Sequence, residues 1–280
     1  MQWTMISLIG RMGSPHENAR RASQRPGTGK PTRLSRSVVQ KGLAGSEGPE
    51  AGAFASDTGK GEPMSGELHR YFLNNGERRL HKWVHYFDIY ERYFDQFRGR
   101  APTILEIGIF GGGSLAMWRD YFGADATILG LDIKPETEKV AGAANRVYIG
   151  SQDDPALLDR VLAENPSIDI VIDDGSHVMR HMIATFEHLY PRISPNGVYL
   201  VEDTHTCYMS KFDGGLRREG SWMEFVKDRL DDLHATYTNG ELKVSAFTRS
   251  TKSISIYDSI AVFEKAPQGK RQAFITEAMS

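Results

Sequence analysis

Short β-branched apolar runs alternate with segments of helical periodicity through the middle of this sequence. Each run is followed by a stretch whose apolar residues recur every three or four positions, which is the pattern of a strand-helix-strand repeat. Five such runs are present, at 103–109, 127–132, 146–149, 168–173 and 197–202. Helices are expected between them, near 112–122, 154–164 and 178–190. The alternation predicts an α/β fold, with a mostly parallel sheet and helices on both faces.

After the fifth run the pattern changes. A loop rich in glycine and charge at 211–220 precedes an expected helix near 221–233, and two strand-like runs follow at 242–248 and 253–263. Consecutive runs of this kind indicate a hairpin. Together with the five parallel strands, the hairpin predicts a seven-stranded sheet.

The first part of the chain has a different character. Residues 1–63 contain Gly, Ser, Pro and Arg without apolar periodicity, which predicts a disordered extension. Met64 stands where globular composition begins, and one hypothesis is that translation of the native protein starts there. Aromatic and apolar residues then recur at helical spacing, so 64–100 is expected to be the helical beginning of one domain spanning 64–280.

Composition narrows the class of protein. With 280 residues, 40% of them hydrophobic, the chain can form one sizeable domain with a core. A net charge of -2 gives no broad cationic field, so nucleic acid is not an expected partner. Cys207 is the only cysteine, which excludes an intrachain disulfide and a thiolate zinc cluster and is typical of a cytoplasmic protein. No apolar run reaches the roughly 18 residues of a membrane span.

A glycine-rich turn follows the first predicted strand. Residues 106–114 read Glu-Ile-Gly-Ile-Phe-Gly-Gly-Gly-Ser, and such a turn lets the backbone approach a ligand at the N-terminus of the next helix. The spacing Glu-x-Gly-x-x-x-Gly differs from the Gly-x-Gly-x-x-Gly of dinucleotide sites, and Glu106 suits an amino group better than a pyrophosphate. Asp132 ends the second strand, where a carboxylate can accept hydrogen bonds from ribose hydroxyls. A helix N-cap is the alternative interpretation of Asp132.

Acidic residues and histidines follow the fourth and fifth strands, which read Ile-Asp-Asp-Gly-Ser-His at 172–177 and Leu-Val-Glu-Asp-Thr-His at 200–205. These strand ends are neighbours in the expected order, so Asp174 and Asp203 are predicted to form an oxygen-rich site for Mg²⁺ or another hard cation such as Mn²⁺. Because side chains alternate along a strand, Asp173 cannot point the same way as Asp174, nor Glu202 the same way as Asp203. Helix caps or loop acids remain the alternative for both aspartates.

The motifs resemble those of the class I S-adenosylmethionine-dependent methyltransferases. Similarity is greatest to the metal-dependent sugar O-methyltransferases of macrolide and rhamnoside biosynthesis, the mycinamicin and macrocin type. It runs from Lys-Trp-Val-His-Tyr-Phe at 82–87 through Tyr-Asp-Ser-Ile at 257–260. The resemblance implies a Rossmann-like class I fold, S-adenosylmethionine as the donor, and a sugar hydroxyl of a glycoside, glycolipid or polysaccharide as the acceptor.

The resemblance also implies roles for single residues. Asp174 and Asp203 would bind magnesium, Glu202 would complete that site or orient His177, and His177 would be the base. The predicted donor-binding residues are Glu106, Gly108, Gly111, Ser114, Asp132, Gln152, Asp153 and Asp173. For Asp153, a helix N-cap before Pro155 is as good an interpretation. Candidates for sugar contacts are His205, Tyr208 and Lys211, and residues expected to reach the cofactor or a neighbouring subunit of a homo-oligomer are Lys82, His85 and Tyr86.

Three other functions stay open at this stage. A catechol or other small vicinal diol could replace the sugar, because the same metal chemistry serves any such acceptor. His177 and His205 with one aspartate could instead supply a two-histidine, one-carboxylate iron site of an oxygenase. A catalytically silent cofactor-binding subunit is the third possibility. Metal analysis and assays of methyl transfer distinguish these functions.

Overall fold

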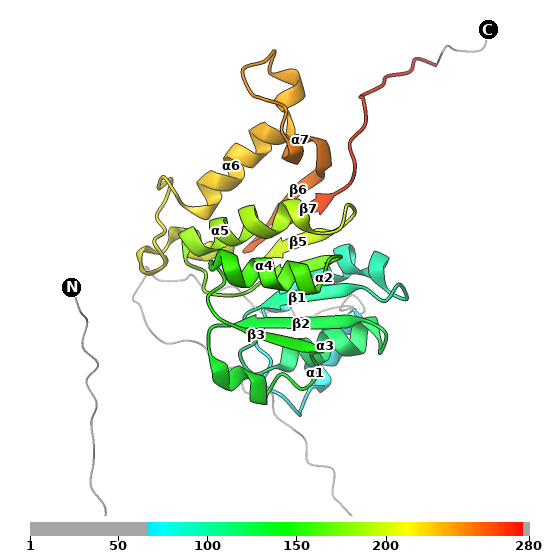
Figure 1. Ribbon diagram of the computed structural model, residues 1–280, viewed down its shortest axis with the longest axis vertical. Coiled ribbons are helices and arrows are strands. Elements are labelled where there is room, and N and C mark those ends of the chain that lie inside the picture. Colours follow the sequence, from blue (N-terminus) through cyan, green and yellow to red (C-terminus); the bar gives the residue numbers. More distant parts are fainter. Residues whose placement is uncertain (1–65, 277–280) are drawn as a thin grey trace, which may run out of the picture. The chain divides into compact units, whose positions relative to one another are not determined.

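A computed structural model describes residues 66–276 of the chain (Figure 1). The predicted extension at 1–63 and Met64 lie outside the described residues, so the domain boundary expected there stays a prediction. The strands are β1 (Thr103–Ile107), β2 (Thr127–Asp132), β3 (Arg146–Ile149), β4 (Ile170–Asp173), β5 (Val198–Val201), β6 (Thr251–Tyr257) and β7 (Ile260–Lys265). The α-helices are α1 (Glu67–Asn74), α2 (Phe87–Phe94), α3 (Gly113–Phe122), α4 (Pro155–Glu164), α5 (Met179–Leu189), α6 (Trp222–Leu233) and α7 (Ala246–Ser250). Short 3₁₀ turns lie at Val84–Tyr86, Asp95–Phe97, Pro135–Lys139, Tyr190–Arg192, Thr204–Tyr208, Ser210–Phe212 and Ala235–Tyr237.

The seven strands form one sheet in the order β3-β2-β1-β4-β5-β7-β6. Strands β1 to β5 are parallel, whereas β7 runs antiparallel to both β5 and β6. The predicted seven-stranded, mostly parallel α/β sheet is therefore confirmed. Because β1 and β4 are neighbours and β4 pairs with β5, the loops after these three strands meet at one edge.

The prediction of a strand at 242–248 is wrong. Ser245 accepts a hydrogen bond from the backbone N–H of Thr248, and Thr248 accepts one from Ser245, so this pair forms a capping box that starts α7. The hairpin instead comes from the run expected as a single strand at 253–263, extended by two residues at each end. Ser259 has a φ of 66°, and the turn at this residue divides the run into β6 and β7.

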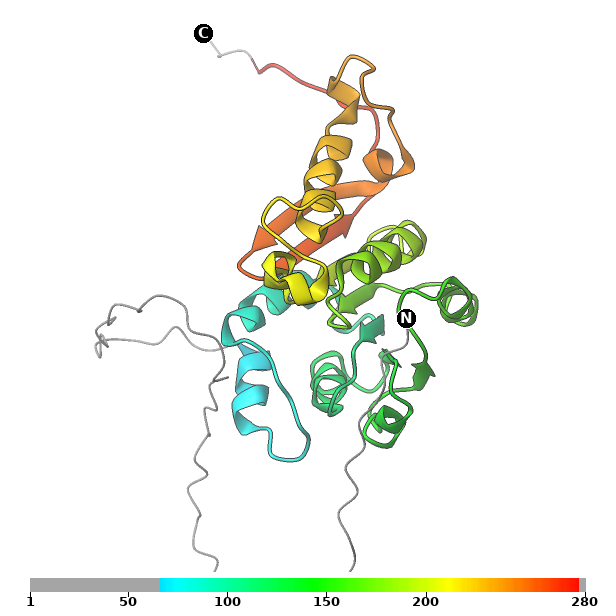
Figure 2. The same ribbon diagram turned by 90° about the vertical axis from the view of Figure 1, so that its left-hand side faces the viewer.

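Helices cover both faces of the sheet, and the alternation of side chains along each strand explains the two cores (Figure 2). On one face, Ile104 and its neighbours pack against α1, α2 and α3. On the other, Leu105 and its neighbours pack against α4, α5 and α6. Helix α5 shows how the sequence produces this packing. Its buried apolar residues recur every three or four positions, so they form one face toward the sheet: Met179, Met182, Phe186 and Leu189.

Local sequence fixes the starts of the helices that flank the carboxyl edge. Asp154, rather than the expected Asp153, caps α4 by accepting a hydrogen bond from the backbone N–H of Ala156, and Pro155 occupies the first helical position. Gly112 precedes α3 with a φ of 72°, and a Cβ there would lie 2.1 Å from the carbonyl oxygen of Val140. Within residues 66–276, no helix is long and apolar enough to cross a membrane.

Candidate active site

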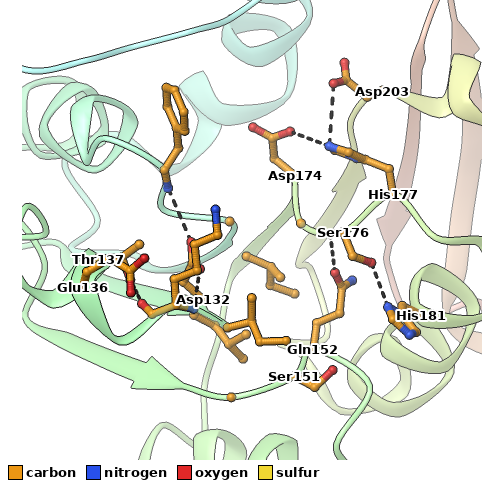
Figure 3. Close-up of a pocket in the computed structure, with 18 of the residues that line it drawn as sticks. Asp132, Glu136, Thr137, Ser151, Gln152, Asp174, Ser176, His177, His181 and Asp203 are labelled. Atoms are coloured by element: carbon orange, nitrogen blue, oxygen red, sulfur yellow. Dashed lines mark hydrogen bonds and ion pairs between the residues drawn. The ribbon is translucent and has the colours of Figure 1, made fainter. Parts of the chain in front are cut away.

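A cavity of about 650 Å³ opens at the carboxyl ends of the central strands (Figure 3). Most of its lining comes from the ends of β1 to β5 and the loops after them, and His81 and His181 are added from the segment before the first 3₁₀ turn and from α5. Six of the predicted site residues line it: Gly108, Asp132, Gln152, Asp174, His177 and Asp203. The topology thus gathers into one cavity residues that lie far apart in the sequence.

The glycine turn lies directly against the strand that carries Asp174. Gly108 has a φ of 94°, and a Cβ on it would come within 2.0 Å of the carbonyl oxygen of Asp174. Such a φ favours glycine, and the close approach leaves no room for a larger residue. The turn after β1 and the start of the loop after β4 are therefore fixed relative to each other.

Asp132 is held in place by the backbone on both sides of its carboxylate. One oxygen accepts a hydrogen bond from the N–H of Ile109 at 2.8 Å, and the other accepts from the N–H of Lys134 at 2.9 Å. Carboxylate oxygens have further lone pairs, and this carboxylate faces the cavity (Figure 3). It can therefore accept hydrogen bonds from a ligand without losing its own.

Gln152 and Asp173 form a buried pair beside the cavity. The Gln152 amide donates to Asp173 at 3.0 Å and accepts from the backbone N–H of Ser176 at 2.7 Å. Burial raises the pKa of Asp173 to about 7, although hydrogen bonds from Gln152, Gly175 and Tyr199 oppose the shift. Asp173 is only 2% exposed and does not line the cavity, so its contact with this ligand site runs through Gln152.

Other predicted donor residues also lie behind the cavity wall. Glu106 is fully buried and accepts a hydrogen bond of 2.7 Å from the Ser114 hydroxyl. Neither of these residues, nor Gly111, lines the cavity. Asp153 stays outside it too, with a carboxylate oxygen 3.4 Å from Nε2 of His181. Their predicted contact with a donor remains a prediction.

Asp174, His177 and Asp203 bring one potential ligand atom each to within 4.8 Å of one another. Nε2 of His177 lies 3.8 Å from Oδ1 of Asp174 and 3.8 Å from Oδ2 of Asp203, as the dashed lines in Figure 3 show. His177 and Asp203 reach these positions from left-handed backbone, with φ of 57° and 52°. Left-handed φ at residues other than glycine costs of order 1 kcal/mol each and is concentrated at functional sites.

A buried lysine connects three acids beneath this cluster. The ammonium of Lys82 donates to Oδ2 of Asp174 at 2.7 Å and to both oxygens of Glu202, at 2.8 and 2.9 Å. It also lies 3.6 Å from Glu106. Burial alone would lower the pKa of Lys82, but the three carboxylates outweigh it and raise that pKa well above its ordinary value. One ammonium cannot neutralise three carboxylates, and burial raises the pKa of both Glu106 and Glu202.

The geometry separates Glu202 from the other predicted metal ligands. Its side chain is 1% exposed, does not line the cavity, and has both oxygens on Lys82. The expected alternation along the strand explains this, because Asp203 faces the cavity and Glu202 the interior. The predicted contact of Glu202 with a metal stays a prediction.

The predicted acceptor residues do not line the cavity. His205 contacts the hydroxyl of Ser259 through Nδ1, Tyr208 is 54% exposed, and the Lys211 ammonium lies 4.7 Å from the ring centroid of Phe212. His81, Ser176 and His181 are among the cavity residues that sequence reasoning missed. Ser176 bonds to His181 at 2.9 Å, and the spacing of these two across the start of α5 was the signal available.

The strand order and the cavity at the carboxyl edge define the class, which is the class I methyltransferase fold. Residues 105–204 match a family model described as a methyltransferase domain. The chain is 36% identical over 214 residues to 8-demethyl-8-(2-methoxy-alpha-L-rhamnosyl)-tetracenomycin-C 3'-O-methyltransferase of Streptomyces olivaceus, covering 71% of this chain and 54% of that protein. It is 31% identical over 235 residues to mycinamicin VI 2''-O-methyltransferase of Micromonospora griseorubida, covering 80% and 57%.

Solved structures agree with the sequence relatives. The MycE methyltransferase from the mycinamycin biosynthetic pathway, in complex with Mg, SAH and mycinamycin VI, matches with a TM-score of 0.62 and 31% identity. The match covers 74% of this chain and 54% of that one. The resemblance inferred from the sequence is therefore confirmed: the chain carries a methyltransferase domain related to the sugar O-methyltransferases of macrolides and rhamnosides. It spans about half the length of the curated relatives it matches.

Proposed function

We propose that this protein is an S-adenosylmethionine-dependent O-methyltransferase that methylates a sugar hydroxyl with the help of a divalent cation. The main support for this proposal is the arrangement of two groups around one cavity. Asp132 lies on one side, and the cluster of Asp174, His177 and Asp203 lies on the other. A donor bound by the first group would lie beside an acceptor bound by the second. The relatives named above, which act on macrolide and rhamnosyl glycosides, support a glycoside as the acceptor.

The donor half of the cavity suits a nucleoside. Asp132 is positioned to accept hydrogen bonds from ribose hydroxyls, and Gln152 lies where an adenine ring would enter after β3. The glycine turn lets the methionine end approach the backbone closely. The apolar side chains of Ile107 and Leu131 complete this pocket.

The acidic half of the cavity fits a hard cation. Oδ1 of Asp174 and Oδ2 of Asp203 are oxygen ligands of the kind that Mg²⁺ and Mn²⁺ prefer, and the other oxygen of each is occupied by a donor from the protein. When bound there, a divalent cation supplies Lewis-acid chemistry, which lowers the pKa of a sugar hydroxyl and orients it. Asp174 and Asp203 are the residues that would hold it.

His177 has the geometry of a general base. Its Nε2 faces the two aspartates and the cavity, where it can take the proton of the attacking hydroxyl as oxygen bonds to the donor methyl. In this in-line displacement the carbon-sulfur bond breaks, and the sulfur keeps its electron pair. The protein contributes mainly by aligning hydroxyl, methyl and sulfur.

The structure does not assemble the iron site considered above. Among the described residues, the metal-competent cluster contains His177 alone of the histidines. His205 turns to Ser259 instead, so the two-histidine, one-carboxylate set is incomplete. The expected homo-oligomer and cytoplasmic location stay predictions, which size-exclusion chromatography and cell fractionation would test.

The test is transfer of labelled methyl from S-adenosylmethionine to rhamnosyl and macrolide glycosides, with and without Mg²⁺. The acceptor set includes a catechol, so that a phenolic acceptor is detected as well. Asp203→Asn is expected to lose at least about 100-fold in turnover, because one cation ligand loses its negative charge, while donor binding persists. Asp213→Asn is the matched control, since Asp213 is also an aspartate at left-handed φ (63°) but pairs with exposed Arg180.

Three results contradict the proposal. One is transfer that survives EDTA undiminished. Another is an equal loss of turnover in the two asparagine variants. The third is absence of donor binding by the wild-type protein, measured by calorimetry.

A further inference from the structure

Two residues that precede the sheet in the sequence contact the two aspartates of the cation site. Lys82 lies in the loop before the 3₁₀ turn at Val84–Tyr86, and Tyr86 ends that turn. The ammonium of Lys82 donates to Oδ2 of Asp174 at 2.7 Å, and the hydroxyl of Tyr86 donates to Oδ1 of Asp203 at 2.7 Å. Each aspartate therefore has one oxygen engaged by this segment.

The remaining oxygens are the ones that face each other across the site. Oδ1 of Asp174 and Oδ2 of Asp203 are the atoms nearest to Nε2 of His177, at 3.8 Å each. A carboxylate with a donor on one oxygen cannot turn freely about its terminal bond without breaking that hydrogen bond. Lys82 and Tyr86 thus select which oxygen of each aspartate is presented.

Both donors are firmly held themselves. Tyr86 is 0% exposed and Lys82 is 8% exposed. Lys82 is anchored from behind by both oxygens of Glu202, and the Tyr86 hydroxyl also lies 3.3 Å from the carbonyl oxygen of Ser259. The backbone next to Lys82 is fixed by a hydrogen bond from the N–H of Gly113 to the carbonyl of Arg79 at 3.1 Å.

We propose that Lys82 and Tyr86 are positioning residues that orient Asp174 and Asp203 for a single divalent cation before it binds. The proposal rests on the cation site of the proposed function and extends it to residues outside that site. Lys82 also keeps Glu202 directed into the interior, so that the cation meets two carboxylates rather than three. Residues that hold metal ligands in this way commonly contribute 10- to 100-fold to metal affinity.

The experiment measures Mn²⁺ affinity of the full chain without donor or acceptor, by calorimetry and by the relaxation of water protons. Tyr86→Phe keeps the ring and removes only the hydroxyl, and we expect about 10-fold weaker Mn²⁺ binding. Tyr93→Phe is the matched control, because its hydroxyl pairs with that of Tyr257 at 2.8 Å away from the cation site. That variant is expected to bind Mn²⁺ as the wild type does.

Lys82 is tested in a charge-balanced background, because Lys82→Met alone would leave buried Glu202 without its partner. The double variant Lys82→Met/Glu202→Gln removes one positive and one negative charge together, so a change in affinity reports orientation rather than net charge. We expect 10- to 100-fold weaker Mn²⁺ binding. Glu202→Gln alone keeps Lys82 on Asp174 and removes one negative charge near the site, so it measures the effect of charge and is expected to weaken Mn²⁺ binding less than the double variant does.

The outcomes separate this inference from the proposed function. If the wild-type protein binds no Mn²⁺, the cation site itself is contradicted, and the proposed function with it. Wild-type binding with unchanged affinity in Tyr86→Phe and in the double variant, at whatever melting temperature, overturns the positioning role alone. An equal loss in Glu202→Gln and in the double variant assigns the effect to Glu202 and overturns the role of Lys82.

Discussion

Gly108 is the position at which one methyl group should disturb both halves of the active site. A Cβ added there would lie 2.0 Å from the carbonyl oxygen of Asp174, whereas an ordinary contact is at least 3.4 Å. The two atoms must therefore move apart by about 1.4 Å. The carbonyl oxygen belongs to the backbone and the backbone fixes the position of the Cβ, so no side chain can rotate to relieve the overlap.

The energetic cost has two parts that a control can separate. An alanine at such a positive φ costs roughly 1 to 3 kcal/mol, and forcing extra volume into a packed site costs roughly 1 to 3 kcal/mol more. Gly123→Ala isolates the first part, because Gly123 has a similar φ of 87° but nothing within 4 Å of its added Cβ. We expect Gly108→Ala to lose about 3 kcal/mol of unfolding free energy and Gly123→Ala about 1 kcal/mol.

Urea denaturation measures the two losses, and calorimetry measures the binding of S-adenosylmethionine and Mn²⁺ to each variant. Gly108→Ala is expected to weaken both ligands at least about 10-fold, because the displaced carbonyl belongs to the residue that presents a cation ligand. Gly123→Ala lies outside the cavity and should bind both normally. Equal stability and equal binding in the two variants would refute the close contact between the glycine turn and β4.

Three further predictions concern other parts of the molecule. Asp132→Ala should weaken S-adenosylmethionine binding about 10-fold or more without changing Mn²⁺ affinity, since its carboxylate faces only the donor half; calorimetry with each ligand tests this. Lys265→Met should lower the free energy of unfolding by about 2 kcal/mol, because the ammonium donates to three carbonyls in and directly after the 3₁₀ turn at Tyr190–Arg192, at 3.0 to 3.2 Å; urea titration tests this. Burial raises the pKa of the Cys207 thiol to about 11, so native protein at pH 8 should react with a thiol reagent far more slowly than urea-unfolded protein. The same shift removes stability as the pH rises from about 9 to 11, because the unfolded chain loses this proton first.

The strands of this fold could be predicted well from the sequence because strand periodicity is a local signal. Runs such as 127–132 and 146–149 coincide with β2 and β3: the first is an apolar run buried on both faces, and the second is a short edge strand made mostly of β-branched and aromatic residues. The run at 242–248 was wrongly predicted to be a strand because a polar capping box overrides its weak strand propensity. The box depends on only two residues.

The site was predictable to the extent that strand ends determine it. Adjacent parallel strands bring Asp174 and Asp203 together, and alternation along a strand turns Glu202 away. The pairing of Glu202 with Lys82 could not be predicted from the sequence, because the lysine lies 120 residues earlier and a single long side chain leaves no periodic pattern. The burial of Glu106 behind the glycine turn could not be predicted either, because a motif shows the spacing of its residues and not how deeply each is buried.

The turn between β6 and β7 has a consequence for how the protein is made. The backbone carbonyl of Ser259 accepts a hydrogen bond of 3.0 Å from the N–H of Thr204, the residue directly after Asp203. The Ser259 hydroxyl also contacts His205, which lies 54 residues earlier in the chain. A nascent polypeptide that has left the ribosome only through Asp203 already holds both acids of the cation site, yet lacks the turn that holds their loop. Until β7 is synthesised, one edge of β5 is open to pairing with other chains. Competence to capture a cation therefore arises only when β7 has been synthesised, together with protection from aggregation.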